Sequence, residues 1–167
     1  LVHYPYGCVD QTASRLIPLY LALTRLPATT PKWVQASLSE RLSNQRLRLI
    51  DMAGEGAQFS WWGNQTDGDL LMSSYAYYAD FLSGQTLGLS RNPDDANVLL
   101  ELYKKQAENT PITEVMLSLW LMREMGLPVN NLASGANRRL LHEWQNASDS
   151  PHASAVFANN KQSLALS

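Results

Sequence analysis

Proline and glycine divide the chain into short segments, each carrying apolar residues at the three- and four-residue spacing of a helix. Thr-Pro or Asn-Pro pairs precede several of these segments, and single glycines follow two of them. Proline is favoured at the first position of a helix, and glycine is favoured just after its end. No stretch of useful length alternates apolar and polar residues as a strand would. The placement of proline and glycine therefore predicts an all-α protein whose helices are joined by short turns.

Six helices are expected from this pattern. Their ranges are 10–26, 30–51, 69–87, 92–108, 110–125 and 131–144. Pro18 lies inside the first range and should either kink that helix or divide it into two. Thr30 and Asn92 should be N-caps, each followed by proline at the first helical position. Helices joined by such short turns should pack as antiparallel pairs.

Two helices and one loop show further patterns in the sequence. On the third helix a heptad-like stripe predicts a buried face with one outward tyrosine. The residues concerned are Leu71, Tyr75, Tyr77, Tyr78 and Leu82. The fifth helix should turn Ile112, Val115, Leu119 and Met122 inward. Between the second and third helices, residues 53–69 are rich in glycine and polar residues, which predicts a loop or short hairpin.

Length and composition set the class of protein. The 167 residues suffice for one domain with a sizeable core, and no apolar run is long enough to span a bilayer. The net charge of −2 and the scattered Lys and Arg residues disfavour binding to nucleic acid or to anionic membranes. The chain starts at Leu1 without a targeting signal, so we interpret it as a piece of a larger polypeptide. We expect residues 1–146 to belong to one helical domain and residues 147–167 to form a weakly ordered tail or a continuation.

The most specific segment spans residues 4–12 and reads Tyr-Pro-Tyr-Gly-Cys-Val-Asp-Gln-Thr. Gly7 permits an unusual backbone angle or a close approach just before a helix begins. Cys8, the single cysteine, should lie at the helix N-terminus, where unpaired N–H groups and the helix dipole stabilise a thiolate. Gln11 follows three residues later, on the same face of the first turn.

A thiol held beside a carboxamide can form an internal thioester with loss of ammonia, because enforced proximity favours ring closure. Taken by themselves, however, a cysteine at a helix start is more often a small buried apolar residue, and a nearby glutamine is usually solvated. The chemistry of Cys8 and Gln11 alone leaves both interpretations open.

The segment resembles the thioester motif of the α2-macroglobulin and complement family, in which Pro-x-Gly-Cys-x-Glu-Gln opens a helix. The residues that support the motif around the reactive pair are Tyr4, Pro5, Tyr6, Gly7 and Asp10. The version with two tyrosines, followed by Thr12 and Pro18, is similar to the bacterial branch of the family. The Phe-Ser-Trp-Trp-Gly segment at residues 59–63 resembles a Gly-rich aromatic segment of the same branch.

The resemblance implies a fold and a mechanism. The family's thioester domain is an α/α toroid of antiparallel helical hairpins, of which this chain would be an incomplete part. Family members trap proteases: cleavage of a bait segment exposes the thioester, which acylates the protease. Cys8 would be the thiol and Gln11 the acyl donor, with Tyr4 and Tyr6 helping to keep water away. Partners would be proteases of a host or competitor and neighbouring domains of the parent chain, in the bacterial periplasm or cell envelope.

One departure from the motif leaves alternatives open. Asp10 stands where the family carries Glu, and its carboxylate is one methylene shorter. The domain could therefore lack the thioester and serve only in contacts with its neighbours. A second alternative is an α/α-barrel enzyme acting on a carbohydrate or an isoprenoid, which rests on fold analogy alone.

The remaining polar and aromatic residues favour structural roles. The histidines match no motif, so we assign no catalytic residue and no general base, and we expect neither a cofactor nor a metal. These histidines are His3, His142 and His152. The cluster of Phe59, Trp61 and Trp62 could stack on a sugar but is more typical of core packing or an interdomain contact. Four carboxylates could suggest a metal site or a glycosidase acid pair, but their positions in or beside a polar loop and in a first helical turn favour an ordinary structural role. They are Asp67, Asp69, Asp94 and Asp95.

Overall fold

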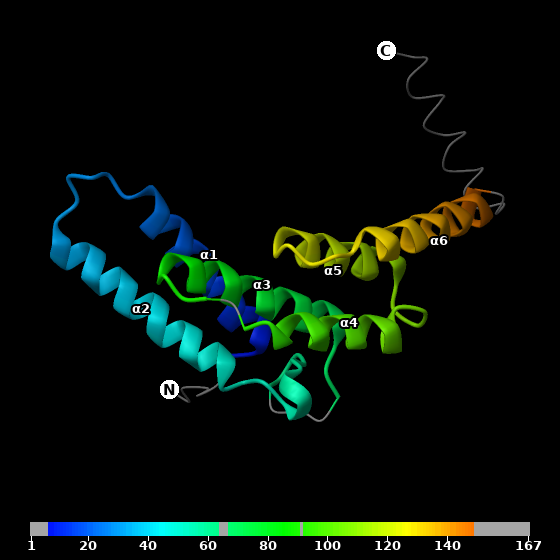
Figure 1. Cartoon of the computed structure of the whole chain (residues 1–167), viewed down its shortest axis with the longest axis horizontal. Coiled ribbons are helices and arrows are strands. Elements are labelled where there is room, and N and C mark those ends of the chain that lie inside the picture. Colours follow the sequence, from blue (N-terminus) through cyan, green and yellow to red (C-terminus); the bar gives the residue numbers. More distant parts are fainter. Residues whose placement is uncertain (1–6, 64–66, 91, 149–167) are drawn as a thin grey trace, which may run out of the picture. The chain divides into compact units, whose positions relative to one another are not determined.

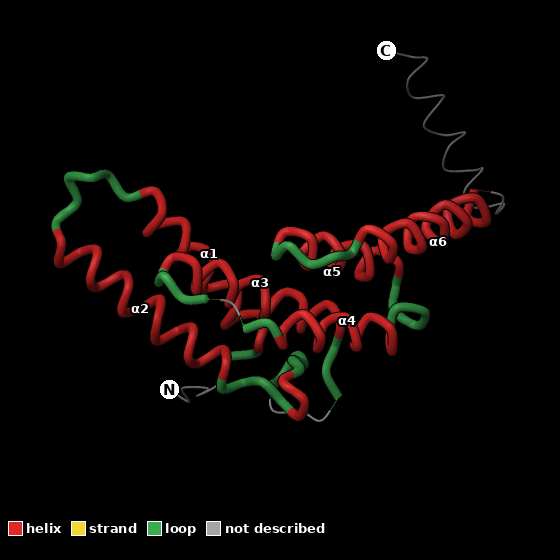
Figure 2. Tube along the Cα trace, viewed as in Figure 1, coloured by secondary structure: helices red, strands yellow, loops and turns green. Residues whose placement is uncertain are grey.

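The computed structural model describes residues 7–63, 67–90 and 92–148. Every regular element in this part of the chain is helical, and Figure 2 shows only helices and loops there. The elements are α1 (Val9–Arg25), α2 (Lys32–Ile50), the short 3-10 helix η1 (Glu55–Ala57), α3 (Leu70–Thr86), α4 (Asp94–Gln106), α5 (Ile112–Glu124) and α6 (Asn130–Ser148). The predicted all-α class is confirmed. The toroid stays a prediction.

The chain divides into two compact units, Leu1–Val129 and Asn130–Ser167. Within the first unit, helices α1 to α5 run in alternating directions, as the short turns predict (Figure 1). The second unit contains α6, on whose surface Nε of Arg139 lies 2.7 Å from Oε1 of Glu143. Most of the predicted tail, residues 149–167, lies outside the described residues.

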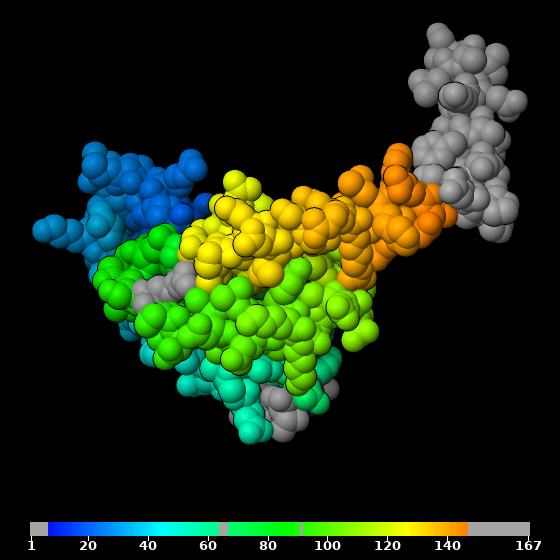
Figure 3. All heavy atoms as spheres, turned by 45° about the vertical axis from the view of Figure 1, so that its right-hand side comes forward, coloured from blue at the N-terminus to red at the C-terminus, as the bar shows by residue number. Residues whose placement is uncertain are grey.

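Helix α3 is the centre of the first unit and packs against α1, α2, α4 and α5. Its innermost face consists largely of small residues, which let the neighbouring helices approach closely. Those fully buried are Ser73, Ser74, Ala76, Ala79 and Ser83. The apolar core around them is filled from the facing helices. Its largest members are Leu16, Leu42, Leu49, Leu99, Leu102 and Met122. Figure 3 shows the green atoms of α3 and α4 lying directly above the cyan segment that follows α2.

The helix ends follow from local sequence. Asp69 caps α3, because its Oδ1 accepts a hydrogen bond of 2.7 Å from the backbone N–H of Met72. Gly88 and Gly126 adopt left-handed φ angles of 70° and 79° after α3 and α5. Pro93 rather than Asn92 occupies the cap position of α4, but Oδ1 of Asn92 accepts a hydrogen bond of 3.2 Å from the N–H of Asp94, the first residue of the helix.

Two predicted helix details differ from the structure. Of the two outcomes expected at Pro18, division of the helix is wrong, since α1 continues through this exposed residue, where water can satisfy the carbonyl that lacks an N–H partner. Thr30 does not cap α2. That helix begins at Lys32, and Pro31 occupies the cap position in an extended conformation.

The stripe predicted to be buried on α3 also differs from the structure. Tyr77 is the buried tyrosine, whereas Tyr75 and Tyr78 are only half-buried, as is Leu71. The reason is that serine and alanine, rather than the bulky residues, form the inner face of this helix. On α5 the prediction is confirmed, since the four residues expected to point inward are buried. They are Ile112, Val115, Leu119 and Met122.

Within the described residues, no helix is both long enough and apolar enough to cross a bilayer.

Candidate functional site

The candidate site lies at the N-terminus of α1, where Cys8 occupies the cap position in an extended conformation. Its Sγ accepts a hydrogen bond of 3.5 Å from the backbone N–H of Gln11. Its carbonyl oxygen accepts a bond of 3.0 Å from the N–H of Thr12. The thiol is half-buried and the Gln11 side chain is exposed. The first turn of α1 therefore aims one of its free N–H groups at the sulfur.

Gly7 makes room for the Gln11 carboxamide. A methyl group at Gly7 would lie 3.1 Å from Oε1 of Gln11 and 3.6 Å from its Cβ, so the glutamine side chain is folded back towards the start of the helix. Gly7 does not belong to the glycines with a left-handed φ angle. The sequence suggested either an unusual backbone angle or a close approach at Gly7, and the structure shows the close approach.

The loop before α3 fixes the start of α1. The carbonyl oxygen of Trp61 accepts a hydrogen bond of 3.0 Å from the N–H of Val9, the first residue of the helix. Phe59 anchors the loop in the core: its backbone N and O bond to Oγ of Ser73 at 2.9 and 3.0 Å, and its ring meets Tyr77 edge-on at 5.4 Å. The described part of the loop therefore links the turn that carries Cys8 to the core through Trp61 and Phe59.

Two further glycines shape this loop. Gly63 has a φ angle of 73°, and a methyl group there would lie 3.2 Å from Cβ of Met52. At Gly68 a methyl group would collide with the side chain of Gln58, which accepts the N–H of Gly68 in a bond of 3.3 Å. Both positions need glycine because the loop closes on itself.

The aromatic cluster predicted at residues 59–62 is split by the fold. Phe59 is buried, but Trp61 and Trp62 remain 52% and 73% exposed. Of the three aromatic residues, only Phe59 therefore packs in the core. The two tryptophans lie on the surface beside the cap of α1.

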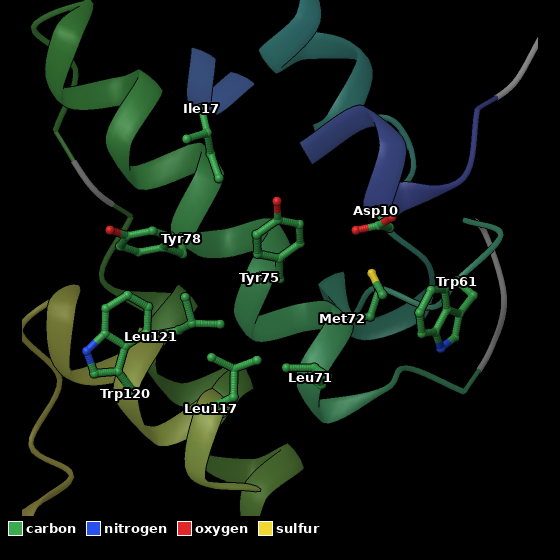
Figure 4. Close-up of a pocket in the computed structure, with 10 residues that line it drawn as sticks. All are labelled: Asp10, Ile17, Trp61, Leu71, Met72, Tyr75, Tyr78, Leu117, Trp120 and Leu121. Atoms are coloured by element: carbon green, nitrogen blue, oxygen red, sulfur yellow. The ribbon is translucent and has the colours of Figure 1, made fainter. Parts of the chain in front are cut away.

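An apolar groove of about 400 Å³ opens on this surface. Asp10 and Trp61 lie at one end of it, and Tyr78 and Trp120 lie at the other (Figure 4). The half-buried stripe of α3 forms the floor between them. We call this feature the aromatic groove.

A short hydrogen-bonded chain joins the groove to α1. Oγ of Ser14 lies 2.9 Å from the hydroxyl of Tyr75, and it donates a bond of 3.5 Å to Oδ1 of Asp10. Asp10 thus lies in the first turn of the helix, two residues from the cysteine, with its carboxylate at the groove.

At the other end of the groove the rings of Tyr78 and Trp120 lie 6.1 Å apart with their planes at 51°. Burial raises the pKa of the Tyr78 hydroxyl, and the carboxylate of Glu124 raises it further. The groove therefore has negative charge near both ends.

A second hollow of about 290 Å³ lies against α2 and α4 and contains two carboxylates, Asp80 and Asp95. Asp80 is bound by Arg46 at both oxygens, with Nε–Oδ1 and Nη2–Oδ2 distances of 2.8 and 3.1 Å. Burial raises the pKa of Asp80, and the Arg46 guanidinium opposes that rise. The enzyme alternative would need an acid pair of this kind, but here Arg46 holds one member in a structural ion pair.

Several residues that the sequence singled out make other local contacts. His142 is exposed on α6, where its Nδ1 lies 3.3 Å from Nδ2 of Asn146. Asp69, Asp94 and Asp95 lie at the starts of α3 and α4. No group of three His, Cys, Asp or Glu side chains suited to a metal occurs among the described residues. The predicted motif residues Tyr4, Pro5 and Tyr6, together with His3 and His152, lie outside the described part of the chain.

Sequence reasoning did not find Ser14, Tyr75 and Trp120 as part of the site. Ser14 follows Asp10 by one helical turn, which is a weak signal. Tyr75 and Trp120 reach the groove only through the packing of α3 and α5 against each other.

The sequence is similar over most of its length to a protein described as alpha-2-macroglobulin from Ralstonia nicotianae. The two are 41% identical, and the alignment covers 94% of this chain. The chain belongs to the bacterial α2-macroglobulin family. It spans about a tenth of the length of this α2-macroglobulin, since the aligned region is 10% of the relative. No family model and no solved structure matches it.

Proposed function

We propose that Cys8 and Gln11 form an internal thioester in a bacterial α2-macroglobulin that captures proteases covalently. The first turn of α1 carries this proposal. There the sulfur of Cys8 accepts the N–H of Gln11 at 3.5 Å, and the Gln11 carboxamide is folded back against Gly7. Thiol and carboxamide therefore belong to one helical turn, and membership of the family supports the chemistry.

The bond would form and break as follows. Sγ of Cys8 attacks Cδ of Gln11, ammonia leaves, and a thioester remains. An amine on a protease then attacks the same carbon, the carbon–sulfur bond breaks, and Cys8 departs as a thiolate. The N–H of Gln11 and the N-terminal end of the α1 dipole would stabilise that thiolate. Each thioester is consumed once, which describes a single-use trap rather than an enzyme.

The setting of this activity follows from the family. We propose a periplasmic or cell-envelope location, with proteases of a host or competitor as the captured partners. Neighbouring domains of the parent chain would cover the thioester until a protease cleaves the bait. The helical hairpins of the first unit would form part of an α/α toroid, which the alternating directions of α1 to α5 support.

Intact mass and methylamine treatment of the complete native polypeptide test the proposal. The thioester form should be lighter than the encoded sequence by one ammonia, and it should gain one methylamine while releasing one titratable thiol. The variant Cys8→Ser is the control, because serine keeps a side-chain cap on α1 but should incorporate no amine. An unshifted mass together with a free Cys8 thiol would leave only the thioester-free interaction domain.

Gly7→Ala tests the geometry itself. The added methyl group would meet Oε1 of Gln11 at 3.1 Å and push the carboxamide away from its folded-back position. We expect the fraction of protein that carries a thioester to fall several-fold. Gly135→Ala is the matched control, because a methyl group there meets nothing within 4 Å. Equal thioester content in both variants would contradict the role given to Gly7.

A further inference from the structure

The aromatic groove begins at the reactive turn, and the thioester chemistry alone does not account for it. Asp10 is two residues from Cys8, and the carbonyl of Trp61 holds the first N–H of α1. Cys8 and Gln11 do not line the groove, but Asp10 of the same helical turn does, so a molecule lying in the groove would have one end at the turn that carries the reactive pair. This position makes the groove a candidate for recognition of the acceptor.

The walls of the groove suit an apolar body. Trp61 and Trp120 are 52% and 50% exposed, and Leu117 is 45% exposed, although side chains of this size are usually covered. A volume of about 400 Å³ lies within the range of small-molecule sites. The aromatic faces would also attract a cation, and tryptophan does so most strongly.

The charge of the groove is of one sign. Among the described residues, Asp10 is the only charged side chain that lines it, and no described Lys, Arg or His does so. Within residues 7–63, 67–90 and 92–148, the structure gives Asp10 no ion-pair partner. The hydroxyl of Ser14 makes only a long contact of 3.5 Å with Oδ1 of this carboxylate. A carboxylate without an ion-pair partner beside exposed aromatic rings is complementary to an ammonium group.

We propose that the aromatic groove is an acceptor subsite that binds a primary ammonium group carrying an aromatic or long apolar body. The ammonium lies at Asp10, and the body lies against Trp61, Tyr75 and Trp120. In a protease this acceptor is a lysine flanked by apolar side chains. The binding part of the proposal stands alone, whereas the role as acceptor subsite rests on the thioester function proposed above.

The subsite leaves the chemistry of transfer unchanged. The bound ammonium loses one proton to solvent, and the free amine forms a bond to Cδ of Gln11. The bond between Cδ and Sγ breaks, Cys8 leaves as a thiolate, and the second amine proton passes to solvent. Binding in the groove raises the local concentration of the amine, so it should speed this step for suitable amines only.

Binding is tested without any thioester in the full chain carrying Cys8→Ser. Phenethylammonium is titrated into nitrogen-15-labelled protein, and the indole N–H signals of the five tryptophans are followed by NMR. We expect the signals of Trp61 and Trp120 to shift and those of Trp33 and Trp144 to stay. Methylammonium lacks the apolar body, phenethyl alcohol lacks the charge, and phenylacetate reverses it. Each should bind at least ten-fold more weakly.

Matched variants separate charge from general effects on folding. Asp10→Asn should weaken phenethylammonium binding about ten-fold, whereas Asp94→Asn removes an equivalent first-turn carboxylate from α4 and should change nothing. Trp120→Ala should weaken binding, and Trp33→Ala should not, since Trp33 is 75% exposed on α2 away from the groove. Equal binding of the alcohol, or unchanged binding in Asp10→Asn, would overturn the proposal.

The acceptor role is tested in the native polypeptide by comparing incorporation of phenethylamine and methylamine at equal concentrations of free amine. Phenethylamine should react at least five-fold faster, and Asp10→Asn should abolish that preference. Equal rates in the unaltered protein would overturn the acceptor role even if the groove binds the ligand. Failure to incorporate either amine would instead refute the thioester, while the indole titration would still decide whether the groove binds ammonium.

Discussion

Leu70 and Leu71 are neighbours in sequence, but the fold uses them differently. Leu70 is fully buried, whereas Leu71 is half-buried and lines the aromatic groove. The same contrast runs along the whole of α3. The buried residues are mostly serine and alanine, with Leu70, Met72 and Tyr77 among them, whereas the residues at the open surface are mostly bulky. Side-chain size therefore does not identify the buried face of this helix. Close helix packing selects the small residues, and the large ones remain available for contacts.

The largest effect that would separate the two faces is expected for Leu70→Ala. Removing a fully buried side chain leaves a cavity, so we expect a loss of about 2–5 kcal/mol in the free energy of unfolding. Leu71→Ala should cost less than about 1 kcal/mol, because that side chain already borders solvent. Chemical denaturation of both variants measures the difference. Similar losses would show that the groove face is part of the core.

The ion pair between Arg46 and Asp80, on the buried side of α3, should make the free energy of unfolding depend on pH. Arg46→Met should reduce the free energy of unfolding at pH 7 by about 2 kcal/mol, because it leaves a partly buried carboxylate without its cation. Burial already raises the pKa of Asp80, and loss of Arg46 should raise it further. A raised carboxyl pKa in the folded state costs stability above that pKa, and the cost disappears as pH falls towards the unfolded value.

The deficit of Arg46→Met should therefore shrink when unfolding is measured at pH 4 instead of pH 7. Arg15→Met, at an exposed position on α1, serves as the control and should show no such trend. If the stability deficit of Arg46→Met instead grew as pH fell, the carboxyl of Asp80 would not have a raised pKa in the folded variant.

Serine side chains on α3 offer a finer comparison. Ser73→Ala should cost about 1–2 kcal/mol, because the buried backbone N–H of Phe59 loses its partner, whereas the C=O of Phe59 keeps its bond from the N–H of Asp69. Ser74→Ala should cost less than about 0.5 kcal/mol, since that hydroxyl bonds only to the carbonyl of Leu70 in its own helix. Thermal unfolding followed by circular dichroism distinguishes them. Equal midpoints would show that Ser73 does not anchor the loop.

The helices could be predicted from the sequence because their ends depend on nearby residues. Asp69, Asn92 and Gly88 act on backbone groups within one turn, so their residue types mark the boundaries directly. The buried face of α3 could not be predicted in this way. Apolar periodicity favours the bulky stripe, whereas the packing of four helices around α3 favours the small one.

The candidate site, too, has a part that could be predicted from local sequence and a part that could not. The three-residue spacing of Cys8 and Gln11 is local, and it predicted their shared helical turn. The support from Trp61 and the contact between Ser14 and Tyr75, 61 residues apart, exist only in the folded chain. The motifs that carry the resemblance lie within residues 4–63, whereas the similarity to the Ralstonia protein covers 94% of the chain.

The smallest expected effect compares one substitution on the two faces. Tyr77→Phe removes a hydroxyl that donates a 2.7 Å bond to the carbonyl of Ala57, so it should cost about 1 kcal/mol. Tyr75→Phe removes a hydroxyl beside the exposed Ser14, where water can replace it, and should change stability by less than about 0.5 kcal/mol. Denaturant titration of the two variants measures both values. A larger loss for Tyr75→Phe would mean that the bonds among Tyr75, Ser14 and Asp10 stabilise the fold. A negligible loss would mean that these bonds contribute little to stability and serve mainly to place Asp10 at the groove.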